Sequence, residues 1–143
     1  MHRHGYKGRK FGREKDQRQA LRRSLMIALF THGKIETTEA KAKEIRRYAE
    51  KLVTRAKKGG LANRRLIIAR LDNLQVANKL VDEIAPKIKR DSGYLRITRT
   101  KLRVGDNTQM AIIEFVDDLT TKPAVKKTEE PAKVTKETKN ADK

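Results

Sequence analysis

Positively charged side chains recur in short clusters along this chain, and their type and spacing suit the binding of phosphate groups. The sequence holds 36 Lys and Arg against 18 Asp and Glu, so its net charge at pH 7 is +18. Such an excess makes self-repulsion costly unless a polyanion lies nearby. Nucleic acid is therefore the expected partner, and an anionic membrane surface is the alternative.

Three regions carry the densest clusters: a glycine-containing arm, a two-faced helical segment and a strand-like segment near the end. Glycine lets the backbone of the arm approach phosphates closely. The alternative for the arm is a flexible charged terminus without a binding role, and for the strand-like segment it is a solvated basic edge. The cations expected to contact RNA are Arg3, Lys7, Arg9, Lys10 and Arg13 in the arm, Arg18, Arg22 and Arg23 just after it, Lys41, Lys43, Arg46 and Arg47 in the helical segment, and Arg96, Arg99 and Arg103 near the end.

Other kinds of chemistry find little support in the sequence. Without cysteine there is no disulfide, thiolate nucleophile or Cys-based zinc site. His2 and His4 lack a third metal ligand nearby, and His32 has no carboxylate or nucleophile beside it. The adjacent Asp82 and Glu83 diverge by about 100° on a helix, so they do not form an acid/base pair. We therefore expect no metal, no cofactor, no small-molecule substrate and no catalysis. Aromatic residues make up only 4%, which favours recognition of backbone and shape over base stacking.

The central helical segment explains how these cations would be positioned. Residues 34–37 alternate like a short strand, and Thr37 or Thr38 can cap a helix that ends at Gly59 and Gly60. Its opposite face is charged, so one side would be buried and the other would meet an acidic partner. The apolar stripe of this helix consists of Ala42, Ile45, Ala49, Leu52, Val53 and Ala56.

Helices are also predicted on either side of this segment. The first begins with a capping-box-like Asp16 and Gln19 and ends before Gly33. Another spans residues 61–71, and Asp72 or Asn73 can cap the next, which Pro86 ends. The expected core positions are Leu21, Leu25, Ala28 and Leu29 in the first helix and Leu74, Ala77, Leu80, Val81 and Ile84 in the last.

Two strands and a tail complete the chain. Residues 94–104 favour a strand with a bulge near 99–101, residues 105–107 a turn, and residues 110–116 a return strand that buries Ala111, Ile113 and Phe115. From residue 119 the sequence mixes Lys, Glu and Pro without aromatics, which predicts disorder. We thus expect a basic arm (1–15), an α+β RNA-binding domain (16–118) with a small sheet packed on helices in two layers, and a disordered tail (119–143).

The sequence also resembles a known family. The segments SGYLRI (92–97), RVGDN (103–107) and MAIIEFVD (110–117) resemble the C-terminal hairpin of bacterial large-subunit ribosomal protein L17, and the resemblance covers about residues 2–117. The pattern similar to the family signature is Ile35-x-Thr37-Thr38-x-x-Lys41-Ala42-Lys43, then Glu50, then Leu52-Val53-Thr54-x-Ala56.

The resemblance implies a structural role in the large ribosomal subunit, close to the polypeptide exit tunnel. The partners it implies are large-subunit ribosomal RNA and neighbouring ribosomal proteins, and the location is the cytoplasmic ribosome. It also implies RNA contacts by the matching positions, which are Arg3, His4, Lys41, Lys43, Asn63, Arg64, Arg65, Arg103 and Asn107.

Three alternatives remain to be weighed. A nucleoid-type DNA-binding protein would share the charge, but it should show a recognition helix after a tight turn or a dimeric β-arm, and neither is evident. A nuclease or RNA-modifying enzyme would need clustered His, Asp or Glu, whereas the acids here are scattered among cations. The longest apolar run, residues 25–30, is far shorter than the roughly 20 residues that span a bilayer, so no membrane is expected.

Overall fold

The computed structural model describes residues 8–119. The predicted RNA contacts of Arg3, His4 and Lys7 lie outside the described residues. So does the predicted disordered tail, apart from Leu119.

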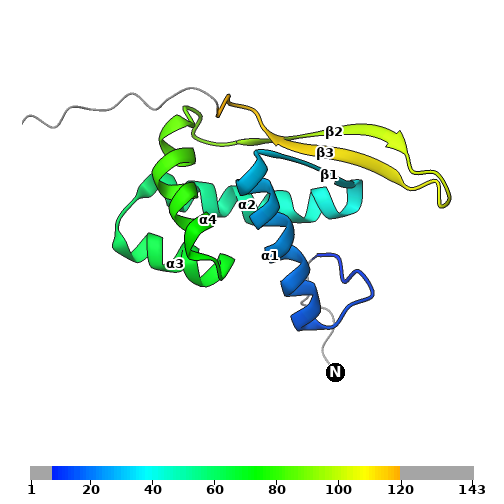
Figure 1. Ribbon diagram of the computed structural model, residues 1–143, viewed down its shortest axis with the longest axis horizontal. Coiled ribbons are helices and arrows are strands. Elements are labelled where there is room, and N and C mark those ends of the chain that lie inside the picture. The colour runs from blue at the N-terminus through cyan, green and yellow to red at the C-terminus, as the bar shows by residue number, and fades with distance from the viewer. Residues whose placement is uncertain (1–7, 120–143) are drawn as a thin grey trace, which may run out of the picture.

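The chain folds as helices packed on a small sheet. The chain begins with helix α1 (Lys15–His32), strand β1 (Lys34–Thr38) and helix α2 (Glu39–Lys58). Two shorter helices follow, α3 (Leu61–Leu71) and α4 (Leu74–Asn78), and α4 continues into the π-helical η1 (Lys79–Ile84) and the 3-10 helix η2 (Ala85–Lys87). The last elements are strands β2 (Leu95–Leu102) and β3 (Gln109–Phe115). The predicted α+β class and the order of helix, strand, three helices and two strands are confirmed. Figure 1 shows the sheet across one side of the helices, with the β2–β3 hairpin extending beyond them.

The sheet is antiparallel, with β3 in the middle and β1 and β2 at its edges. Ile113 of β3 lies opposite Ile35 of β1 on one side and Ile97 of β2 on the other. The predicted bulge is confirmed, because the β2–β3 register shifts between Arg99 and Leu102. The predicted inward face of β3 is also confirmed: the buried residues are Ala111, Ile113 and Phe115.

Helix α2 packs against all three strands and against α1 and α3, and its apolar stripe is the centre of the core. The six buried residues are the six predicted ones: Ala42, Ile45, Ala49, Leu52, Val53 and Ala56. Gly59 ends the helix at φ 65°, and its N–H donates to the carbonyl oxygen of Ala56 over 3.1 Å. The predicted hydroxyl cap is wrong, because no side chain caps this helix. Thr38 is still the last residue of β1, opposite Met110, and alternation along that strand directs Thr37 into the core instead.

Helix α1 ends as predicted but begins differently. Gly33 stops it in the left-handed conformation at φ 76°, where its N–H donates to the carbonyl oxygen of Leu29 over 2.8 Å. The capping box is wrong: the helix begins one residue before Asp16, and its N-cap Glu14 makes no side-chain cap bond. The buried residues are Met26, Leu29 and Phe30, whereas the predicted Leu21, Leu25 and Ala28 are only partly buried. The inward face is set by Phe30, which packs on Phe115 with ring centroids 6.2 Å apart.

The last helix departs from regular α geometry but buries a single stripe of residues. Asn73 caps it as predicted, because its side chain accepts a hydrogen bond from the N–H of Val76 over 3.0 Å. Leu74 is 59% exposed, against the prediction, and Val76 is buried in its place. The buried residues Val76, Ala77, Leu80 and Ile84 keep helical spacing through the π-helical η1, whereas Leu74, the first residue of α4, lies off this stripe. Pro86 lies in η2, where the helix ends.

Candidate nucleic-acid interface

The second half of the arm lies against α2. The backbone N–H of Arg9 donates a hydrogen bond of 3.2 Å to Oε2 of Glu44. A Cβ on Gly8 would lie 2.9 Å from Oε1 of the same carboxylate, and φ of this residue is +129°, a backbone conformation that favours glycine. Nη1 of Arg18 lies 3.5 Å from the carbonyl oxygen of Arg13. The predicted arm contacts that the structure describes are exposed on this surface: Arg9, Lys10 and Arg13.

The two central arginines of α1 are oriented by side chains of other helices. Nη1 of Arg22 donates a 2.7 Å hydrogen bond to the hydroxyl of Tyr48, and the guanidinium carbon lies 4.7 Å from the centroid of that ring. The same nitrogen is 3.9 Å from Oε1 of Glu44. Nη1 of Arg23 lies 3.1 Å from Oδ2 of Asp72. These contacts fix where both guanidinium groups point.

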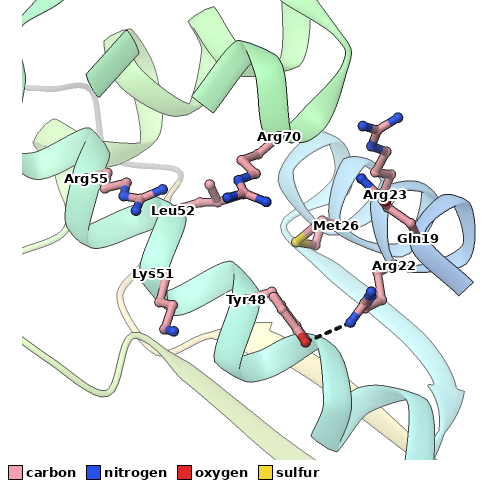
Figure 2. A pocket seen from close by; sticks show the side chains of 9 residues that line it. All are labelled: Gln19, Arg22, Arg23, Met26, Tyr48, Lys51, Leu52, Arg55 and Arg70. Carbon is pink, nitrogen blue, oxygen red and sulfur yellow. Dashed lines mark hydrogen bonds between the residues drawn. The ribbon is translucent and has the colours of Figure 1, made fainter. Parts of the chain in front are cut away.

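A hollow of about 290 Å³ opens between α1, α2 and α3 beside these arginines (Figure 2). Met26 and Leu52 of its lining are buried core residues, and Tyr48 is half-buried. No carboxylate is among the described residues that line it. The hollow therefore combines an apolar floor with a strongly positive rim, whose five cations are Arg22, Arg23, Lys51, Arg55 and Arg70.

The outer face of α2 carries the four cations predicted there. Nζ of Lys43 lies 2.7 Å from Oε1 of Glu39, and Nε of Arg46 lies 3.1 Å from Oε1 of Glu50, each pair one helical turn apart. Arg47 is exposed and has no ion-pair partner among residues 8–119. Lys41, also predicted, is half-exposed.

The three predicted residues of α3 have different environments. Nδ2 of Asn63 donates to the carbonyl oxygen of Gly59 over 2.7 Å, which fixes the start of the helix. Arg64 forks onto the carboxylate of Asp82 and also donates to Oδ1 of Asn78 over 3.2 Å, so it ties α3 to α4 and η1. Arg65 alone of the three is exposed without a described partner.

Arg99 joins the hairpin to the start of α2. Its Nε lies 2.9 Å from Oε1 of Glu39, the carboxylate that Lys43 also contacts. Hydrogen bonds from Lys43 and then from Arg99 lower the pKa of Glu39 below its ordinary value. Nη2 of Arg96 lies 2.7 Å from Oε1 of Glu114 on the neighbouring strand. Three predicted RNA contacts thus also bind carboxylates of this chain.

The turn at the tip of the hairpin is held by its own ion pair. Arg103 donates to both carboxylate oxygens of Asp106, at 3.0 and 2.5 Å, and the hydroxyl of Thr108 donates to Oδ2 over 2.8 Å. The bonds from Arg103 and Thr108 hold the pKa of Asp106 well below its usual range, and Asp106 in turn raises the pKa of Arg103. Asn107 takes a left-handed φ of 51°, and Val104 beside the turn is 99% exposed.

Comparison with known proteins assigns this basic, helix-and-hairpin fold to a family. Residues 21–116 match the family model described as Ribosomal protein L17. The chain belongs to the ribosomal protein L17 family. It is 53% identical over 116 residues to the large ribosomal subunit protein bL17 of Campylobacter jejuni subsp. doylei and to that of Campylobacter lari, over 80% of this chain and 97% of each relative. The bL17 protein of Sulfurimonas denitrificans is 52% identical over 116 residues, 80% of this chain and 98% of its own.

Membership of the L17 family confirms the resemblance drawn from the sequence. The family is a structural component of the ribosome and not an enzyme, so the predicted non-enzymatic class is confirmed as well. Within residues 8–119, His, Asp and Glu side chains form no group of three or more that could hold a metal ion. In the same part of the chain, none of the helices has the length and apolar character needed to cross a membrane.

Three cations of the hollow in this L17 family member were not among the predicted contacts: Lys51, Arg55 and Arg70. Lys51 and Arg55 are four residues apart on α2, and that spacing alone places them on one face. Arg70 carries no such signal, since it reaches the hollow only because α3 packs on α2. The structure gathers these three with Arg22 and Arg23, whereas the hairpin tip lies away from this site (Figure 1).

Proposed function

We propose that the chain is a structural constituent of the large ribosomal subunit and binds large-subunit ribosomal RNA through its arm, the α1–α2–α3 face and the hairpin. The observation that carries this proposal is the hollow, which is lined by five cations and by no acidic residue among those described. Phosphates are the partner that such a surface fits. The relatives reported above, each named as a large ribosomal subunit protein, support the same conclusion.

The cations differ in how they would contribute to RNA binding. Within residues 8–119, some have no carboxylate partner, and their charge is fully available to phosphate; these are Arg47, Lys51, Arg55, Arg65 and Arg70. Others are already bound to carboxylates of this chain, which positions them but offsets part of their charge; these are Lys43, Arg46, Arg64, Arg96, Arg99 and Arg103. We expect the first group to give more of the salt-dependent affinity.

The proposal extends to the place of the protein on the ribosome. A position close to the polypeptide exit tunnel rests on the resemblance of the sequence motifs to the family. The β2–β3 hairpin extends past the helices and bears the exposed Val104, so it is the described element with the reach to meet a neighbouring ribosomal protein (Figure 1). The ribosome is a cytoplasmic particle, and the cytoplasm is the compartment we propose.

The test is the salt dependence of binding by the full chain to large-subunit ribosomal RNA and to duplex DNA of equal length. If the rim of the hollow, Arg47 and Arg65 each neutralise one phosphate, this face contributes a slope of about −2.1 to −2.7 in a plot of log K against log salt. The expected result is a slope at least this steep and tighter binding of the ribosomal RNA. A salt-insensitive complex, or tighter binding of DNA, would contradict the proposal and favour a nucleoid-type role.

A further inference from the structure

The hollow between α1, α2 and α3 has a chemistry that a phosphate patch alone does not need. We propose that it receives one unstacked nucleotide of the RNA, with the phosphate on the rim cations and the base against Tyr48 and Met26. This inference rests on the proposed function and specifies which feature of the RNA the site takes.

The cations on the rim of the hollow are suited to bind the phosphate of the nucleotide. Arg55 of α2 and Arg70 of α3 approach from opposite sides, and Figure 2 shows their guanidinium groups turned toward one another across Leu52. Neither has a carboxylate partner among residues 8–119, and the same holds for Lys51 nearby. Unpaired cations on the rim of one hollow repel one another until an anion lies between them. A phosphate suits this place because guanidinium groups bind its oxygens in pairs.

The apolar floor of the hollow and the ring of Tyr48 are suited to bind the base of the nucleotide. Met26 is 5% exposed and Leu52 is 3% exposed, so both present the edge of the apolar core to the hollow. Tyr48 is held in place, because Nη1 of Arg22 donates to its hydroxyl over 2.7 Å and the guanidinium lies 4.7 Å from the ring centroid. Proteins recognise unstacked RNA bases by stacking them on aromatic rings and on arginine planes. A phosphate would gain nothing from such a floor.

The size of the hollow sets the number of nucleotides. Its volume of about 290 Å³ lies just below the range of small-molecule sites, which span roughly 300–1,000 Å³. A helical duplex presents a convex surface and stays outside, whereas a nucleotide splayed out from a loop or bulge projects far enough to enter. The site therefore selects a single-stranded or bulged position of the RNA.

The first test separates the ring of Tyr48 from its hydroxyl. Large-subunit ribosomal RNA is titrated with the full chain at several salt concentrations. We expect Tyr48→Leu to weaken binding about tenfold with the salt slope unchanged, because lost stacking releases no counterions. Tyr48→Phe loses the hydroxyl but keeps the ring and its contact with the Arg22 guanidinium, and should bind within about twofold of the unchanged protein. Thermal melts establish that each variant is folded.

The second test removes rim charge. Arg55→Gln combined with Arg70→Gln should flatten the salt slope by about 0.7–0.9, the value for the one phosphate that the two arginines share. The matched control is Lys34→Gln combined with Lys58→Gln, two exposed lysines that do not line the hollow. It removes the same net charge and should change the slope less. An equal change in both pairs would show that only the overall charge matters.

Ultraviolet cross-linking of the unchanged protein to the RNA provides a test that needs no variant. We expect mass spectrometry to find a nucleotide joined to the peptide that contains Tyr48 or Met26, at a single RNA position. Cross-links confined to other peptides, together with equal binding by Tyr48→Leu and Tyr48→Phe, would overturn the inference while a steep salt slope left the proposed function standing. Binding that does not respond to salt would instead overturn the proposed function itself.

Discussion

Mutations on the two faces of α2 should affect different properties: those on the buried face the stability of the protein, and those on the exposed face its affinity for RNA. Ile45 is 1% exposed in the core, and truncating such a residue to alanine typically costs about 2–5 kcal/mol. Arg46 and Arg47 lie on the exposed face, so changing both to glutamine removes only the 3.1 Å pair between Arg46 and Glu50. Such a surface pair contributes about 0.3–0.5 kcal/mol, and relief of repulsion on a chain of net charge +18 offsets part of it.

Two assays on the same proteins measure this difference. In a thermal melt, Ile45→Ala should lower Tm by about 8 °C or more, while the arginine double variant should shift it by no more than a few degrees. In a salt-titrated binding curve with large-subunit ribosomal RNA, the double variant should weaken binding and flatten the slope by about 1.4–1.8. Ile45→Val, with an expected cost of about 0.5–1.5 kcal/mol, controls for the core change.

The reasoning would be refuted if the arginine double variant unfolded while its RNA affinity stayed intact. In that case α2 would be a structural element held by its arginines. The RNA surface would then have to lie in the arm and the hairpin alone.

Three further predictions concern the carboxylates and the tail. The pKa of Glu39 is lowered in the folded state, so its ionised form stabilises the fold at a pH above the usual pKa range of glutamate. This stability is lost as the pH falls through the folded-state pKa. The urea midpoint of Glu39→Gln should therefore drop less between neutral pH and pH about 3 than that of the exposed control Glu83→Gln. Glu44→Ala removes the carboxylate that accepts from the N–H of Arg9, so limited trypsin digestion should cut the arm faster, and an unchanged rate would show that Glu44 does not hold it. Removal of residues 120–143 should leave Tm and incorporation into large subunits unchanged, because their composition favours solvation over packing; a clear loss of either would contradict this.

The parts of the fold that the sequence predicted well are those set by a local period. All six buried residues of α2 follow from one 3.6-residue stripe over a long helix, and the inward face of β3 follows from strict alternation. The prediction failed at Leu74, which is the first residue of its helix and lies off the stripe that Val76, Ala77, Leu80 and Ile84 form. It also failed at the hydroxyl cap of α2, since Thr38 belongs to a strand whose pairing the local sequence does not show.

The sequence predicted that the candidate site binds a polyanion, but not which residues come together to form it. Counting cations identified a surface for a polyanion, yet the contact between Arg99 and Glu39 joins residues 60 positions apart. The hollow depends on the packing of three helices, so Arg70 could not be assigned to it from its neighbours in the sequence. The place of Tyr48 in the site could likewise not be predicted, because its ring is fixed by Arg22, which lies 26 positions away in the sequence.

The most direct test of the central claim is sedimentation of a cell extract through a sucrose gradient, with the protein followed by mass spectrometry. A structural constituent of the large subunit should travel with free large subunits and with whole ribosomes, and raising the salt should release it as its phosphate contacts weaken. A protein found with the nucleoid, or remaining at the top of the gradient at low salt, would contradict the account.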